Sequence, residues 1–78
     1  MRTTLRDIYA AGWQDGCAAA QSGAYCEDTA KRHARAYMRY TREAFGLTPR
    51  YGVRVLYAYH VGYTDGAWTA RELPRAGG

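Results

Sequence analysis

The first candidates for chemistry in this chain are its two histidines and two cysteines, His33, His60, Cys17 and Cys26. These are residue types that ligate zinc, but their spacings match no usual zinc motif. The glycines lie inside amphipathic patterns and form no phosphate-binding loop. We therefore expect no metal site and no other cofactor. Both thiols are expected to be free, as in an intracellular protein, and a disulfide between them stays open.

The second candidate chemistry is a pair of carboxylates, Asp15 and Asp65, which sit at equal positions in an internal repeat. Residues 9–16, Tyr-Ala-Ala-Gly-Trp-Gln-Asp-Gly, return as residues 59–66, Tyr-His-Val-Gly-Tyr-Thr-Asp-Gly. General acid–base catalysis needs a defined geometry that this spacing does not imply. We interpret each aspartate as structural, accepting a hydrogen bond from a tyrosine hydroxyl or an arginine across a helix interface. We expect a protein that is not an enzyme.

Each copy of the repeat carries two glycines four residues apart. A Gly-x-x-x-Gly pair lets two helix backbones approach closely. The sequence therefore predicts that the two copies pack against each other. The residues expected at this contact are Tyr9, Gly12, Gly16, Tyr59, Gly62 and Gly66.

Two segments have the apolar spacing and the end signals of helices. The first is expected over about residues 4–22, where Thr4 and Asp7 form a variant capping box. The second is expected over 27–45, with acidic residues in its first turn, where the helix dipole favours them. Gly46 follows as its stop. The buried side of the second segment is predicted to consist of Ala30, Ala34, Tyr37, Thr41, Ala44 and Phe45.

The third segment, expected over 49–73, has conflicting signals. Thr48 and Pro49 are an N-cap and a first-position proline, which favour a helix. Strand-forming residues alternate from Tyr51 to Tyr63, and Asp65-Gly66 would suit a hairpin turn. The repeat favours the helix, because its first copy is rich in alanine. A hairpin, or a helix broken near Gly62, stays open.

A helical third segment makes residues 1–78 one all-α domain, a three-helix up-down-up bundle whose first and third helices run parallel. The alternative is an α+β fold with a C-terminal hairpin. A chain of this length buries only about 60% of its unfolded surface, which leaves little core for a deep pocket and favours a binding protein. No signal peptide or apolar run of membrane-spanning length is present. We expect a cytoplasmic protein with no membrane partner.

Aromatic residues are numerous, and eight of the eleven Tyr, Trp and Phe residues fall into two groups. Tyr9, Tyr37 and Tyr59 lie on apolar stripes and are expected in the core. Five others fall at stripe edges, where aromatic side chains form the rim of a core or anchor an interface. These five are Trp13, Tyr40, Tyr57, Tyr63 and Trp68.

The charge pattern has one distinct feature, a stripe of cations on the outer face of the segment 27–45. The chain has 11 Lys+Arg against 7 Asp+Glu, a formal net charge of +4, and no acid lies between Lys31 and Arg42. A stripe of one sign attracts an acidic protein surface or a nucleic-acid backbone. The expected partner-binding residues are Lys31, Arg32, Arg35, Arg39, Tyr40 and Arg42.

The repeated Tyr-x-x-Gly-aromatic-x-Asp-Gly motif resembles segments of small phage- and prophage-encoded proteins, and so does the short, basic format of the chain. Anti-CRISPRs and other inhibitors of host nucleic-acid machinery belong to that class. The resemblance implies a phage-type inhibitor that docks on a host complex, such as a CRISPR effector, and blocks it in the host cytoplasm.

Two other functions stay open at this point. The same arginine face could bind DNA or RNA directly. A homodimeric structural subunit could use the glycine faces between chains, and a monomer and a homodimer are equally compatible with the sequence.

Overall fold

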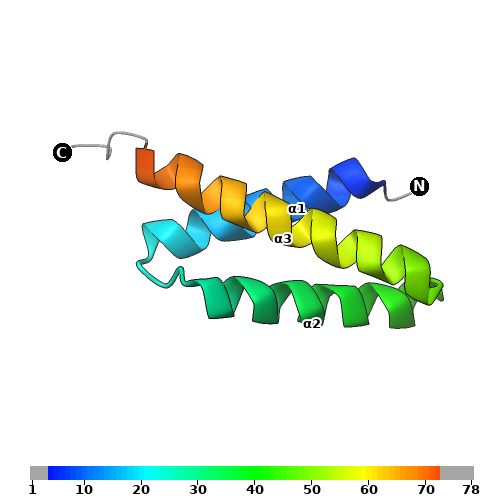
Figure 1. Cartoon of the computed structure of the whole chain (residues 1–78). Helices are drawn as coiled ribbons and strands as arrows, with labels where there is room; N and C mark the ends of the chain where they lie inside the picture. Colours follow the sequence, from blue (N-terminus) through cyan, green and yellow to red (C-terminus); the bar gives the residue numbers. More distant parts are fainter. Residues whose placement is uncertain (1–3, 73–78) are drawn as a thin grey trace.

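A computed structural model describes residues 4–72, and nearly all of them lie in three helices. These are α1 (Leu5–Gln21), α2 (Glu27–Phe45) and α3 (Pro49–Glu72). α1 and α3 run in the same direction and cross, while α2 runs in the opposite direction alongside α3 (Figure 1). The predicted all-α, up-down-up bundle is confirmed. Residue 73, the predicted end of the third helix, lies outside the described residues.

The hairpin alternative for the third segment is wrong, and so is the broken helix. α3 is continuous from Pro49 to Glu72, through Gly62 and Gly66. The apolar alternation does not produce a strand because α3 packs against both other helices. Tertiary contacts on two sides override the strand preference of its side chains.

Local hydrogen bonds begin α1 and α3 where the sequence predicts. The backbone N–H of Thr4 donates to the Asp7 carboxylate at 3.0 Å, and the N–H of Asp7 donates back to the Thr4 hydroxyl at 3.3 Å. The bond from the Thr4 backbone is the main reason why the pKa of Asp7 is lowered. At the start of α3, the Thr48 hydroxyl accepts a hydrogen bond from the N–H of Tyr51 at 3.2 Å.

The sequence predicts the residue that ends α2 but not the residue that caps its start. Cys26 is its N-cap, and the Cys26 sulfur accepts a hydrogen bond from the N–H of Thr29 at 3.4 Å. Cysteine is not a usual capping residue, so this role of Cys26 could not be predicted from its residue type. Gly46 ends the helix with φ of +63°, in the left-handed region that glycine enters at no steric cost.

The crossing of α1 and α3 is made by the four repeat glycines. A side-chain carbon added at any of them would collide with a backbone carbonyl of the other copy. Gly12 faces Tyr59, Gly16 faces Tyr63, Gly62 faces Tyr9, and Gly66 faces Trp13. An offset of 50 residues relates both halves of this set, so α1 and α3 are related by a pseudo-two-fold axis. The predicted Gly-x-x-x-Gly packing is confirmed.

α2 covers only one face of the α1–α3 pair. Ala30 and Ala34 are fully buried and small, which lets α2 lie close to α3. Tyr37 of α2 stacks on Tyr59 with ring centroids 4.5 Å apart. The buried core consists of Ile8, Ala30, Ala34, Val55, Tyr59 and Tyr63.

Two predictions about burial are wrong, and the core position predicted for Tyr9 holds only in part because Tyr9 is half-buried. Tyr63 is fully buried, not at an edge, because Tyr25 stacks on its ring and His33 meets the ring edge-on. Ala44 and Phe45 are exposed, not in the core. Both lie at the last turn of α2, where the chain leaves the helix for α3.

Candidate docking surface

The two aspartates that resemble a catalytic pair are bonded across the helix crossing instead. The Tyr9 hydroxyl donates to the Asp65 carboxylate at 2.6 Å, and the Tyr59 hydroxyl donates to the carboxylate of Asp15. The two bonds are related by the same offset of 50 residues. The predicted structural role, a hydrogen bond from a tyrosine hydroxyl, is confirmed for both carboxylates.

These bonds keep the phenols protonated. Burial, followed by the hydrogen bond to Asp15, raises the pKa of Tyr59 far above its ordinary value. The hydrogen bond to Asp65 is the main reason why the pKa of Tyr9 is raised. The motif Tyr-x-x-Gly-aromatic-x-Asp-Gly is therefore explained by packing and hydrogen bonding within the fold.

The structure does not bring the histidines and cysteines into one cluster. Within residues 4–72, no three His, Cys, Asp or Glu side chains are placed to hold a metal ion. Cys17, which is partly buried, and Cys26, which is exposed, are both free thiols in this structure. The Cys26 sulfur interacts with the Thr29 hydroxyl, and this contact lowers the pKa of the thiol. Its geometry is that of a helix cap.

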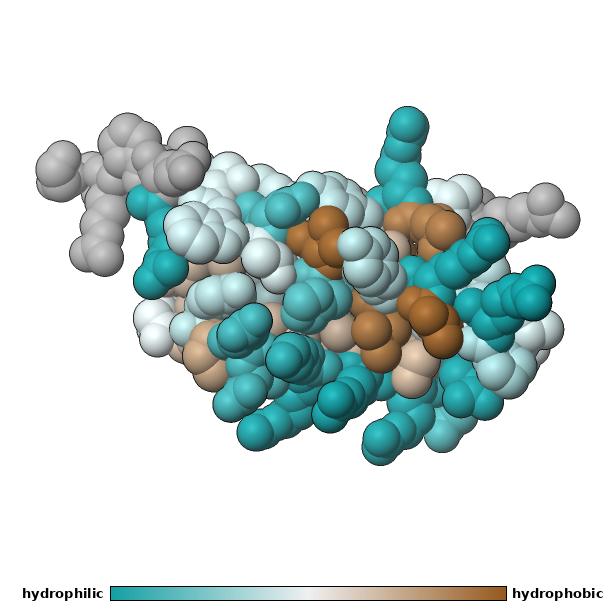
Figure 2. All heavy atoms as spheres, in the orientation of Figure 1, coloured by the Kyte–Doolittle hydropathy of each residue, from teal (hydrophilic) through white to brown (hydrophobic). Residues whose placement is uncertain are grey.

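The predicted cation stripe lies on the outer face of α2. Lys31, Arg32, Arg35, Arg39 and Arg42 are all exposed, and so is Tyr40. The opposite face of α2 carries the buried residues Ala30, Ala34 and Thr41. Figure 2 shows hydrophilic side chains along the lower edge of the molecule, over α2.

One edge of this stripe meets α3. The aliphatic stem of Arg42 lies over Gly52, where an added Cβ would be 3.2 Å from the Arg42 Cδ. Further along the same seam is a notch of about 270 Å³, lined by Lys31, Ala34, Arg35, Leu56 and His60. The Nε2 atom of His60 is buried there without a hydrogen-bond partner. The seam therefore joins basic side chains of α2 to apolar side chains of α3.

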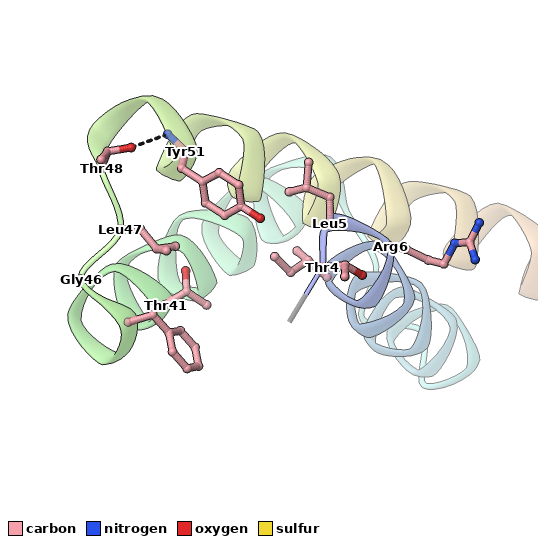
Figure 3. A pocket seen from close by; sticks show the side chains of 10 residues that line it. Thr4, Leu5, Arg6, Thr41, Gly46, Leu47, Thr48 and Tyr51 are labelled. Atoms are coloured by element: carbon pink, nitrogen blue, oxygen red, sulfur yellow. Dashed lines mark hydrogen bonds between the residues drawn. The ribbon is translucent and has the colours of Figure 1, made fainter. Parts of the chain in front are cut away.

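A groove of about 950 Å³ lies between the start of α1 and the α2–α3 connection. Figure 3 shows Leu5, Leu47 and Tyr51 around it, while Arg6 directs its guanidinium away. Among the described residues that line it there is no acid, histidine or cysteine. The groove offers apolar contact from Leu5, Ile8 and Leu47, with threonine and tyrosine hydroxyls at its lining.

The structure also exposes a surface that the sequence did not single out. Val53, Tyr57 and Trp68 of α3 are 65%, 68% and 55% exposed. Their spacing of four and eleven residues puts them on one face of the helix. In the sequence, Tyr57 and Trp68 fell at a stripe edge, and Val53 was part of the strand-like alternation. The helical spacing of residues 53, 57 and 68 was the signal from which this exposed surface could have been predicted.

Comparison with protein-family models, with curated proteins and with solved structures finds no match for this chain. No helix within residues 4–72 is both long and apolar enough to cross a membrane.

Proposed function

We propose that this chain is a non-enzymatic binding protein that docks on an acidic surface through the cation stripe of α2. The observation that carries the proposal is the exposure of five cations on one helix face, with no acid between Lys31 and Arg42. In the leading version, the protein is a phage-type inhibitor that covers a host nucleic-acid-handling complex, such as a CRISPR effector. That version is supported by the resemblance of motif and format.

The proposed mechanism is electrostatic attraction followed by steric blocking. The stripe speeds association with an acidic partner. Arg side chains then grip carboxylates in a two-pronged geometry that Lys cannot provide. Because Ala30 and Ala34 fix α2 on α3, the cations are held on a rigid element. The bulk of the bundle then excludes other ligands from the partner surface.

The alternative is direct binding of DNA or RNA by the same cations. In that case the logarithm of affinity should fall linearly with the logarithm of salt concentration, with a slope of about −0.9 per phosphate neutralised. The structure disfavours the remaining alternative, a homodimer joined through the glycine faces. Those faces are already filled within one chain.

The experiment that tests the proposal is capture of partners from a bacterial lysate on immobilised protein, with and without nuclease. A retained protein complex that survives nuclease supports docking on a protein. Loss of all captured material after nuclease supports direct nucleic-acid binding.

Two charge-reversed variants make this experiment specific. Arg35→Glu/Arg39→Glu should lose the captured complex. Arg6→Glu/Arg71→Glu has the same change in net charge, but its substitutions lie on α1 and α3, and it should keep the complex. Surface changes of this kind usually move stability by less than about 0.5 kcal/mol, which thermal melts can verify. Full capture by a folded Arg35→Glu/Arg39→Glu variant would show that the stripe is solvated surface only.

A further inference from the structure

The docking surface does not end at the edge of α2. Val53 and Tyr57 of α3 expose about two thirds of their side-chain surface to water. Leu56, half-buried, lies between them and the basic seam, because it lines the notch together with Lys31 and Arg35. An exposed group of apolar side chains bordered by charge is typical of a protein interaction site. In Figure 2, hydrophobic side chains gather over α3 directly above the hydrophilic edge of α2.

Cations from both helices flank this apolar group. On the α2 side are Lys31 and Arg35. On the other flank is Arg54, which is exposed and one helical step from Val53. α3 has no acid from Pro49 to Thr64, and Asp65 is bonded to the Tyr9 hydroxyl. An occupant therefore needs apolar side chains at its centre and carboxylates along its sides.

We propose that α3 and the basic edge of α2 together bind an acidic amphipathic helix of a partner protein. Two apolar side chains of that helix, four positions apart, would pack against Val53, Leu56 and Tyr57. Its acidic residues would pair with Lys31 and Arg35. This inference rests on the proposed docking function and names the chemistry of the partner.

The same surface is poorly matched to nucleic acid. Tyr57 could stack on a base, but the aliphatic side chains of Val53 and Leu56 offer nothing to a phosphate backbone. Burying them against a charged backbone gives no hydrogen bond and leaves phosphate groups to be desolvated. The apolar component therefore selects a protein as the partner.

The test uses three fluorescent probes of equal net charge and measures binding to the full chain by anisotropy at constant salt. The first probe is a helical Glu/Ala peptide with two central leucines four positions apart. The second is the same peptide with serine in place of both leucines, and the third is single-stranded DNA. The leucine peptide should bind about tenfold more tightly than the serine peptide, because a buried apolar side chain at an interface contributes about that much affinity.

Substitutions then assign that preference to α3. Tyr57→Ala should abolish the preference for leucine, while Phe45→Ala should leave it unchanged. Phe45 is a matched control, because it is an aromatic residue of a helix with 60% exposure, and it lies at the end of α2. Melting curves would verify that both variants are folded.

Each outcome separates the inference from the proposed function. Equal binding of the two peptides, with loss of both on Arg35→Glu, would overturn the inference and leave docking by the stripe intact. Binding of DNA alone would overturn the choice of a protein partner. Absence of binding to all three probes would count against both proposals.

Discussion

At the scale of single residues, the two tyrosine–aspartate bonds are chemically the same but lie in different surroundings. α2 lies over Tyr59, which is 3% exposed, and its bond to Asp15 is partly buried. The bond from Tyr9 to Asp65 is exposed. Water can replace a lost partner at the exposed bond but reaches the buried one poorly.

Tyr59→Phe should therefore destabilise the protein more than Tyr9→Phe. Loss of the Tyr59 hydroxyl removes a charge-assisted hydrogen bond from a partly buried site, at a cost of about 1–2 kcal/mol in the free energy of unfolding. Urea denaturation of the two variants measures the difference. Equal losses would mean that α2 does not shield the Tyr59 site.

Alkaline pH should weaken the fold through the same phenols. The pKa values of Tyr9, Tyr37, Tyr59 and Tyr63 are all raised in the folded protein. Their unfolded pKa is about 10. A tyrosine whose pKa is higher in the folded than in the unfolded state contributes its full stabilisation only at pH values below its unfolded pKa. The free energy of unfolding should therefore decline as pH rises above about 10.

Urea denaturation at increasing pH measures this decline, and Tyr59→Phe should make it shallower. If the free energy of unfolding declines equally with pH in Tyr59→Phe and in the wild type, the Tyr59 phenol is not the main cause of the decline.

At the scale of elements, the crossing of α1 and α3 depends on the absence of side chains. A Cβ at Gly16 would meet the Tyr63 backbone, with its Cα at 2.8 Å, and backbone cannot move aside cheaply. At Gly52 the nearest atoms belong to the flexible side chain of Arg42. Gly16 and Gly52 both lie in helices. Only the repeat glycines are required, because there the backbones of α1 and α3 approach too closely for any side chain.

Gly16→Ala should destabilise the protein by about 1–3 kcal/mol or more, because the added carbon forces the helices apart. Gly52→Ala is the matched control. It should be neutral or stabilising, since alanine is favoured over glycine inside a helix by about 0.5–1 kcal/mol. Thermal melts followed by circular dichroism compare the two. A Gly16→Ala variant that melts with the wild type would contradict the glycine contact.

At the scale of the whole molecule, α3 is the central element. It packs along both α1 and α2, whereas the backbones of α1 and α2 hardly approach each other. Opening of α2 would expose Ala30 and Ala34 but would leave the α1–α3 crossing in place. Opening of α3 would dismantle both contacts. The bundle is therefore a helix pair with a third helix on one side.

Amide hydrogen exchange should reflect this arrangement. Exchange should be slowest in α3 around residues 55–67, where both neighbours cover the helix, and faster in α2, which can open alone. Mass spectrometry of peptic fragments or nuclear magnetic resonance would measure it. Protection in α2 equal to that in α3 would indicate a single cooperative unit instead.

From the sequence, the first two helices and the contact between the repeats were predictable, while the signals for the third helix conflicted. Helix ends are local events, so Thr4, Thr48 and Gly46 identify them through capping and backbone conformation. The repeat was equally informative. Glycines four residues apart determine which helix faces can meet, and that meeting leaves each aspartate beside a tyrosine of the other copy.

Only the tertiary structure decided which side of the helix pair is covered. The two copies share their tyrosine, glycines and aspartate, yet α2 packs over Tyr63 and leaves Trp13, its counterpart, only half-buried. The same placement leaves Val53 and Tyr57 in water. The periodic spacing of apolar residues identifies the apolar faces of a helix but not which of them another helix covers. Which apolar side chains become core and which stay available to a partner depends on where a distant helix packs, and the pattern does not encode that.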